Sequence, residues 1–238
     1  MAGVTLARTG DLLEITICRS ERRNALGEEE WERLDAAVAE AEGDPTCQFV
    51  LMQGSGDFFC SGADLDHMER AARLDALLAL IETNTAILRR FERLPQIVLA
   101  ALNGPAIGIG VHIALCADII FAVDAAYFWI PEARLGIADV LHFGMLEQRL
   151  GRSAAFSMTL LGRKLSAADA LSRGLIAEVS ADQGQLRGSV GACLTNLRAL
   201  NTAVRMVVKR HANSLAARSH PAEQLAASAY VLDQGKTK

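Results

Sequence analysis

A carboxylate within an apolar segment is the first candidate for acid–base chemistry in this sequence. Glu132 follows Pro131 and an aromatic run at residues 127–129. Apolar surroundings raise the pKa of a carboxyl group because they disfavour its charged form. A raised pKa brings a general base closer to neutral pH, where it transfers protons efficiently. A surface ion pair between Glu132 and Arg134 is the simpler interpretation, and the segment alone leaves both open.

A glycine-rich turn at residues 103–110 offers a second kind of chemistry. It leads into a helix that contains His112, and the first N–H groups of a helix have no partner within it. The helix dipole adds partial positive charge there, which suits an anion or a developing oxyanion. The turn matches neither the P-loop nor the dinucleotide-binding fingerprint, so nucleotide phosphate binding is not favoured.

Small residues form another turn at residues 58–65, after a predicted strand. Small side chains at such a place let the backbone approach a ligand closely. Asp64 is placed to cap the helix that follows. An ordinary strand-to-helix turn is the simpler interpretation of this segment when it is taken alone.

Alternating strands and helices must position these turns. Hydrophobic periodicity predicts helices at residues 28–42, 71–94 and 111–117. This order favours an α/β fold with mostly parallel strand pairing. The strands are predicted at residues 4–8, 12–18, 49–53, 96–102 and 118–123.

The pattern becomes helical after Phe143. Further helices are predicted at residues 186–197, 201–214 and 221–232. No low-complexity linker separates the two halves. We therefore expect a core at residues 1–180 and a helical C-terminal region at residues 181–238, which together form a single functional unit.

The composition excludes several classes of protein. Of 238 residues, 51% are hydrophobic and 5% are aromatic, and the formal net charge is −4. These values fit a sizeable aliphatic core but not a disordered chain or a polyanion binder, so no nucleic-acid partner is expected. The five cysteines are odd in number and have no CxxC spacing. They argue against a disulfide framework or a zinc site and indicate a reducing, cytoplasmic location.

One stretch resembles a membrane-spanning segment in its lack of charged residues. Residues 97–117 contain no Asp, Glu, Lys or Arg, but glycines, Pro105 and His112 interrupt the stretch. A buried strand, a turn and a buried helix explain it better than a lipid-facing helix. The first eleven residues show no apolar region typical of a signal peptide. We expect no association with membranes.

Five segments, in their order along the chain, resemble the enoyl-CoA hydratase/isomerase family, also called the crotonase superfamily. They are the early element RSERRNAL at residues 19–26, the turns at residues 58–65 and 103–110, the segment around Glu132, and a late element that begins with LGRKLS at residue 161. Ser20 stands where the early element of the family usually has proline. The resemblance runs from about Val4 to Leu232 and implies a spiral of repeated β-β-α units with a helical C-terminal region that forms trimers.

The resemblance also implies an oxyanion hole, which by position belongs to the backbone N–H groups of Ala63 and Ile109. The implied substrate is an acyl-CoA thioester, or the same thioester on an acyl carrier protein. Coenzyme A would arrive as part of the substrate, and no permanently bound cofactor or metal is expected. The implied assembly is a homotrimer or a hexamer. The residues carried over to the CoA-binding side are Arg23, Ala25, Ser61, Ala63, Asp64, Leu65 and Gly110.

Departures from the family pattern bear on the reaction. Family hydratases have two glutamates; the second falls at Glu132, but the first falls at His112. Members with only the second glutamate resemble Δ3,Δ2-enoyl-CoA isomerases, in which one carboxylate moves a proton from C2 to C4. We therefore favour an enoyl-CoA double-bond isomerase, with enoyl-CoA hydratase as the alternative. Other enolate chemistry stays open because fold does not fix reaction, and an inactive acyl-CoA-binding or interaction protein is an alternative of another class.

Two further residues are candidates for a second catalytic group. His112 stands three positions after Ile109, so a helix could turn it toward the same pocket, where it would act near neutral pH. A core histidine that is hydrogen-bonded to a carbonyl group is its simpler interpretation. Asp139 follows Glu132 by seven residues, which is similar to the family's dienoyl-CoA isomerases, and it would restore a two-carboxylate site. A solvent-facing aspartate is the simpler interpretation of Asp139.

Overall fold

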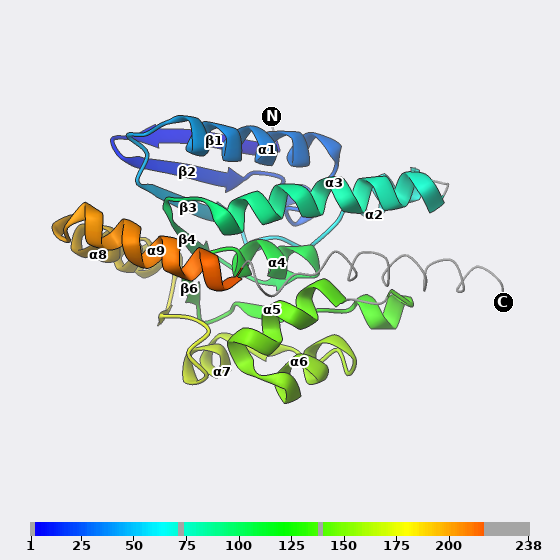
Figure 1. The fold of residues 1–238 in the computed structure, drawn as a ribbon. Coiled ribbons are helices and arrows are strands. Elements are labelled where there is room, and N and C mark those ends of the chain that lie inside the picture. The colour runs from blue at the N-terminus through cyan, green and yellow to red at the C-terminus, as the bar shows by residue number, and fades with distance from the viewer. Residues whose placement is uncertain (1–2, 71–73, 138–139, 217–238) are drawn as a thin grey trace.

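A six-stranded sheet forms the centre of the protein, for which a computed structural model describes residues 3–70, 74–137 and 140–216 (Figure 1). The strand order is β1-β2-β3-β4-β6-β9. The first two strands pair antiparallel and all the others pair parallel, which confirms the predicted α/β class. The strands are β1 (Val4–Thr9), β2 (Leu12–Ile17), β3 (Phe49–Gly54), β4 (Ile97–Leu102), β6 (Ile119–Val123) and β9 (Glu178–Ser180).

A smaller sheet of three short strands lies beside the large one and carries the turns singled out above. Its order is β5-β7-β8, with β5 parallel to β7 and β7 antiparallel to β8. Because β7 ends at Trp129, two residues before Pro131, this sheet fixes the point from which the Glu132 segment starts. The strands are β5 (Ala106–Ile107), β7 (Tyr127–Trp129) and β8 (Leu165–Ser166).

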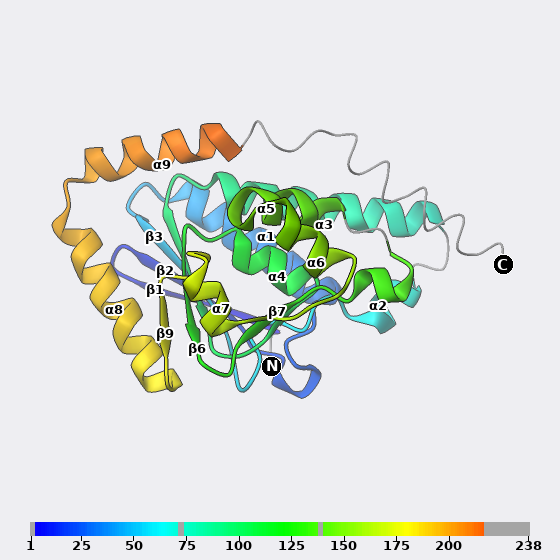
Figure 2. The ribbon, with the colours of Figure 1, turned by 90° about the horizontal axis from the view of Figure 1, so that it is seen from below.

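Helices cover the sheets, and α8 and α9 lie along the side of the molecule away from α2 (Figure 2). Helix α1 buries an apolar stripe, in which Trp31, Leu34 and Val38 face the core as their spacing predicts. The long helices are α1 (Glu28–Gly43), α3 (Leu74–Arg93), α5 (Val140–Leu150), α8 (Gln183–Ala199) and α9 (Thr202–Ala216). The short ones are α2 (Leu65–Arg70), α4 (Ile109–Leu115), α6 (Arg152–Thr159) and α7 (Ala167–Ser172).

The charge-free stretch at residues 97–117 comprises β4, β5 and α4, as the sequence predicts. Every residue of β4 after Ile97 is buried, and so is every residue of α4 after Ile109. In the part of the chain that the structure describes, no helix has the length and apolar character needed to cross a membrane.

Most predicted boundaries differ from the observed ones by one to three residues. The helix after the glycine-rich turn begins at Ile109, two residues earlier than expected, because Gly108 with φ +53° turns the backbone directly into it. The segment that follows Asp64 is helical as well, over α2, and the next described helix, α3, starts at Leu74. The helix predicted at residues 221–232 lies outside the described residues.

Candidate active site

The two turns lie side by side. The Ile107 N–H donates to the carbonyl oxygen of Cys60 at 2.9 Å, and Cys60 forms a parallel bridge with Ala106. Gly62 has φ +106°, and a Cβ atom there would lie 3.1 Å from the Ile107 carbonyl oxygen. Glycine therefore allows the backbone of one turn to approach the other closely.

Ala63 and Ile109 both border one cavity of about 580 Å³. Within the described part of the chain, neither of their backbone N–H groups donates a hydrogen bond. The adjacent N–H groups are occupied, since that of Asp64 donates to the Leu26 carbonyl at 2.9 Å and that of Gly108 donates to the Trp129 carbonyl at 2.8 Å. Unused N–H groups in a cavity can stabilise an oxyanion, so the arrangement suits the predicted role. Whether both groups converge on one oxygen stays a prediction.

Glu132 borders the same cavity and rests against the glycine-rich turn. Its Oε1 atom lies 2.5 Å from the position that a Cβ atom on Gly108 would occupy. The Gly108 N–H donates to the Trp129 carbonyl at 2.8 Å, and this bond ties the turn to the strand that leads to Glu132. The carboxylate is thus placed where a substrate bound at the turn would meet it.

The surface ion pair with Arg134 does not form in the described structure. Arg134 is exposed, and its Nε atom lies 2.8 Å from the position that a Cβ atom on Gly162 would occupy. Glu132 opens a short 3-10 helix, Glu132–Leu135, after Pro131, and only part of the residue is exposed. Of the two interpretations of this segment, the cavity-lining carboxylate is the one that fits the structure.

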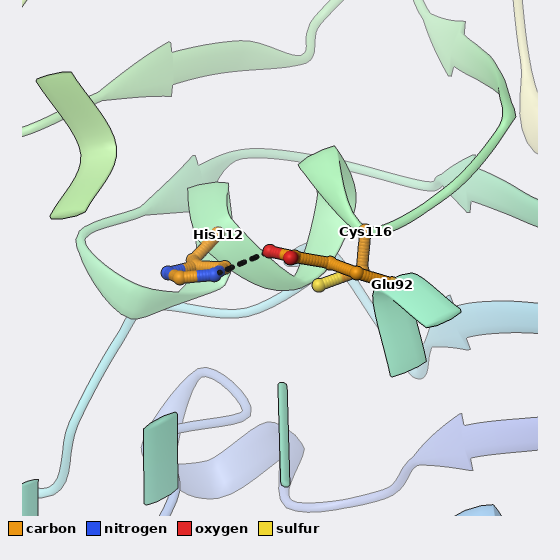
Figure 3. A group of neighbouring side chains, drawn as sticks. All are labelled: Glu92, His112 and Cys116. Carbon is orange, nitrogen blue, oxygen red and sulfur yellow. Dashed lines mark hydrogen bonds and ion pairs between the residues drawn. The ribbon is translucent and has the colours of Figure 1, made fainter. Parts of the chain in front are cut away.

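His112 does not border the cavity, contrary to the expectation that the helix turns it there. Its side chain is 3% exposed, and Nε2 lies 3.1 Å from Oε1 of Glu92 on α3 (Figure 3). The physical reason is that α4 meets the cavity with Ile109 at its start, whereas the His112 side chain turns to Glu92 on α3. The simpler interpretation, a core histidine, is thus close to the structure, but its partner is a carboxylate.

The ligand atoms of Glu92, His112 and Cys116 all lie within 4.8 Å of one another, as in a metal site (Figure 3). The chemistry of these donors fits a cation poorly. Burial raises the pKa of the Cys116 thiol well above its usual range, so the neutral thiol is the stable form. The positive charges of Arg149 and Lys209 act electrostatically on the same thiol and lower its pKa, and the same charges would repel a metal ion. A hydrogen-bonded core cluster is the better description.

Two histidines that the sequence analysis did not single out, His67 and His142, border the cavity. His142 lies in the first turn of α5 and is 4% exposed. Its ring contacts that of His112 edge-on, with centroids 5.5 Å apart. The feature of the sequence that could have identified His142 is its place in the helix that follows the Glu132 segment. Asp139, the other candidate in that stretch, lies outside the described residues.

The residues carried over to the CoA-binding side fall mostly on the same cavity. Its wall includes Arg23, Ala25, Ser61, Ala63, Asp64 and Leu65. Gly110 is the exception, because it is buried against Cys60, whose carbonyl oxygen would lie 2.4 Å from a Cβ atom at residue 110. Gly110 therefore allows the two turns to pack and does not border the cavity.

Asp64 is held by an ion pair at the edge of this wall. Its Oδ2 atom accepts from Nη1 of Arg19 at 2.7 Å, and its Oδ1 atom accepts from the Asp66 N–H at 3.0 Å. Burial acts to raise the pKa of Asp64, but the Arg19 hydrogen bond and charge outweigh it and lower the pKa below its usual value. A charged, paired Asp64 fixes the start of α2, as the capping interpretation predicts.

The chain is similar to known proteins in both sequence and fold. Residues 8–237 match the family model described as enoyl-CoA hydratase/isomerase. A relative described as probable enoyl-CoA hydratase echA6 of Mycobacterium bovis is 37% identical over 138 residues, which is 58% of this chain and 53% of the relative. The chain thus spans about half the length of the curated relatives it matches.

Solved structures show the same fold over nearly the whole chain. A putative enoyl-CoA hydratase/isomerase from Acinetobacter baumannii has a TM-score of 0.85 and 27% identity, with 98% of this chain and 93% of that chain covered. An enoyl-CoA hydratase/isomerase from Mycobacterium paratuberculosis has a TM-score of 0.89 over 97% of this chain and 94% of that chain. At 23% identity, the second comparison supports the fold alone.

Proposed function

The chain belongs to the enoyl-CoA hydratase/isomerase family, and from this premise we propose that it moves the double bond of an enoyl-CoA thioester through an enolate. One observation carries the proposal: the Glu132 carboxylate rests against the Gly108 turn, in the cavity that the unused N–H groups of Ala63 and Ile109 also border. A base and an oxyanion site in one cavity are the parts that this reaction needs.

In the proposed reaction, the carboxylate of Glu132 removes a proton from C2 of a 3-enoyl thioester. The electron pair moves toward the thioester oxygen, and the N–H groups of Ala63 and Ile109 stabilise the enolate that forms. A proton is then added at C4, so that the double bond lies between C2 and C3. The mass of the substrate does not change.

Hydration of a 2-enoyl thioester is the second candidate. The relatives that are described as enoyl-CoA hydratases favour it. The position of the first family glutamate weighs against it, because His112 stands there and is bonded to Glu92 behind the cavity wall. An inactive scaffold is less consistent with a cavity that contains both Glu132 and the two amides.

We propose that coenzyme A enters as part of the substrate and that no resident cofactor takes part. The side chains of Arg22 and Arg23 border the cavity and suit the phosphates of a CoA thioester. The same thioester on a carrier protein would present similar phosphate chemistry. A reducing, cytoplasmic location is proposed as well, in line with the five free cysteines.

A trimer or hexamer is the proposed assembly. The apolar side chains of Val204, Val207 and Val208 are each about 60% exposed on one face of α9, where no other described residue covers them. Their three- and four-residue spacing makes this a continuous stripe that a partner subunit would cover. Sedimentation or light scattering that finds a stable monomer at micromolar concentration would contradict the proposed assembly.

Mass spectrometry on a panel of thioesters tests the reaction. We expect 3-enoyl-CoA to give a product of unchanged mass with a moved double bond, which NMR locates. Uptake of water by 2-enoyl-CoA would instead support the hydratase, and loss of carbon dioxide from a malonyl-type thioester would support a decarboxylase. Binding of all thioesters without turnover would support the inactive scaffold.

A further inference from the structure

A buried imidazole borders the cavity in addition to the base. His142 is 4% exposed, and it shares the cavity with Glu132 and with the amides of Ala63 and Ile109. Histidine is the side chain whose ordinary pKa lies nearest to neutral pH, so it can both accept and give a proton under working conditions. The position and chemistry of His142 therefore suit proton transfer to a bound substrate.

The contact between His142 and His112 indicates how far His142 lies from the oxyanion site along the axis of α4. Its ring lies edge-on to that of His112, with centroids 5.5 Å apart and an interplanar angle of 71°. His112 is three residues beyond Ile109 on α4, which corresponds to about 4.5 Å along the helix axis. Two carbon–carbon single bonds and the shorter C3–C4 double bond separate the thioester carbonyl carbon from C4, a span of about 4 Å when extended. An acyl chain that runs along α4 thus brings C4 to the level of His142.

We propose that His142 is a second proton-transfer residue, which gives a proton to C4 after Glu132 has taken one from C2. The inference rests on the proposed function and deepens it, because it divides between two residues the shuttle that one carboxylate would otherwise perform. It also explains how proton transfer can occur without the first family glutamate, whose position is occupied by His112.

The proposed steps balance without any further reactant. The Glu132 carboxylate takes the C2 proton, and the electron pair of that C–H bond enters an enolate conjugated with the C3–C4 double bond. The His142 imidazolium gives its N–H proton to C4, and the electrons form the new double bond between C2 and C3. The proton on Glu132 then passes to the neutral imidazole across the cavity, which restores both groups.

The buried pair behind the wall acts as a positioning element. Glu92 lies 3.1 Å from Nε2 of His112, and both side chains are nearly buried, at 11% and 3% exposed (Figure 3). The carboxylate fixes the orientation of the His112 ring, and the edge of that ring supports His142. Glu92 and His112 act through His142 and do not touch the substrate in this proposal.

Isotope transfer in a single turnover tests the inference. A 3-enoyl-CoA that carries deuterium at C2 is mixed in ordinary water with an excess of the wild type, His142→Asn, His142→Gln, Glu132→Gln or His211→Asn. The last variant is a matched control, since His211 is an exposed histidine on α9. NMR follows the loss of deuterium at C2, its arrival at C4 and the formation of the 2-enoyl product.

For the wild type and His211→Asn, we expect a product with hydrogen from water at C4. Both His142 variants should slow double-bond migration by about 10²-fold or more, because a positioned acid is lost. They should still exchange deuterium at C2, and this retained exchange shows that the cavity is folded. Glu132→Gln should lose both exchange and migration.

Three outcomes would overturn the inference. Deuterium found at C4 in the wild-type product would show that Glu132 alone carries the proton. Wild-type migration rates in the His142 variants would leave His142 without a catalytic role, while the proposed function stands. A wild type that shows neither exchange nor migration would overturn the proposed function together with the inference.

Discussion

Glu132 and Gly108 are in direct contact: the Oε1 atom of the carboxylate lies 2.5 Å from the position that a Cβ atom on residue 108 would occupy. The candidate base and the turn that carries the oxyanion amide are therefore fixed relative to each other. Glycine is required at residue 108 for two reasons: its backbone has φ +53°, and the Glu132 carboxylate fills the space that a side chain would need.

Gly108→Ala should reduce kcat because the added methyl group displaces the Glu132 carboxylate. It should also lower the free energy of unfolding by about 1–2 kcal/mol, the cost of a left-handed backbone at a residue with a Cβ atom. Gly151→Ala is the matched control, since φ is +83° there and nothing lies within 4 Å of the added atom. Urea unfolding and steady-state kinetics of both variants measure the two effects. If Gly151→Ala loses as much kcat as Gly108→Ala, the contact with Glu132 is not the cause.

Ala63→Pro should slow turnover by about 10²–10³-fold, because proline has no N–H to donate to the enolate oxygen. Ala63→Gly keeps the N–H group and should retain most of the activity. Steady-state kinetics on a 3-enoyl-CoA give the rates, and circular dichroism confirms that each variant is folded. Equal rates in folded Ala63→Pro and Ala63→Gly would remove Ala63 from the oxyanion site.

The sequence was sufficient for the parts of the site that depend on backbone turns. Small residues at 58–65 and 103–110 follow strands, and parallel pairing brings such segments together, as Cys60 and Ala106 show. The role of Glu132 came from the resemblance to the family, because its own segment also allowed a surface ion pair with Arg134.

Side-chain directions within helices could not be predicted in the same way. The spacing from Ile109 to His112 fits a residue that faces the cavity, but this side chain turns to Glu92, which is twenty residues earlier in the chain. Long-range pairing of this kind leaves no local pattern in the sequence. His142 was missed for the same reason, since only the packing of α5 on α4 brings it to the cavity.

Gly110→Ala should destabilise the protein, because its Cβ atom would lie 2.4 Å from the Cys60 carbonyl oxygen and would push the two turns apart. The expected loss is about 1–3 kcal/mol, as for other overpacked sites. Gly188→Ala is the opposite case: the residue lies within α8 with open space around it, so alanine should stabilise by roughly 0.5–1 kcal/mol. Thermal unfolding compares the two. A neutral Gly110→Ala would mean that the turns can separate at little cost.

The ion pair between Asp64 and Arg19 should make stability depend on pH. Arg19 lowers the pKa of Asp64 below its ordinary value despite burial, so the folded state binds the proton more weakly than the unfolded state. The contribution is therefore fully present above the ordinary carboxyl pKa, and it is lost as the pH falls through the lowered pKa. Asp64→Asn should cost about 1.5–3 kcal/mol at pH 7, and its difference from the wild type should narrow in acid.

Urea unfolding of the wild type and Asp64→Asn from pH 7 downward measures this difference. Asp66→Asn is the control, because Asp66 pairs with Arg22 at the surface, where an ion pair contributes about 0–1 kcal/mol. A difference between the wild type and Asp64→Asn that stays constant down to pH 3 would show that the charge of Asp64 is not what stabilises the start of α2.

Glu132→Gln is the decisive substitution for the proposed reaction. The amide keeps the shape of the side chain against Gly108, but it cannot accept a proton from C2 at neutral pH. Turnover should therefore fall to background, while the dissociation constant of a thioester product stays close to that of the wild type, because the contacts of Ala63, Ile109 and the arginines at the cavity edge remain. Steady-state kinetics and isothermal titration calorimetry measure the two quantities separately. A variant that loses binding in proportion to turnover would point to a structural role for Glu132, and one that keeps full activity would refute the mechanism.

The predicted rise in the pKa of Glu132 is tested by the pH profile of kcat/KM in the wild type. If the carboxylate acts as a desolvated base, the acidic limb of this profile should lie above the ordinary glutamate pKa of about 4.3.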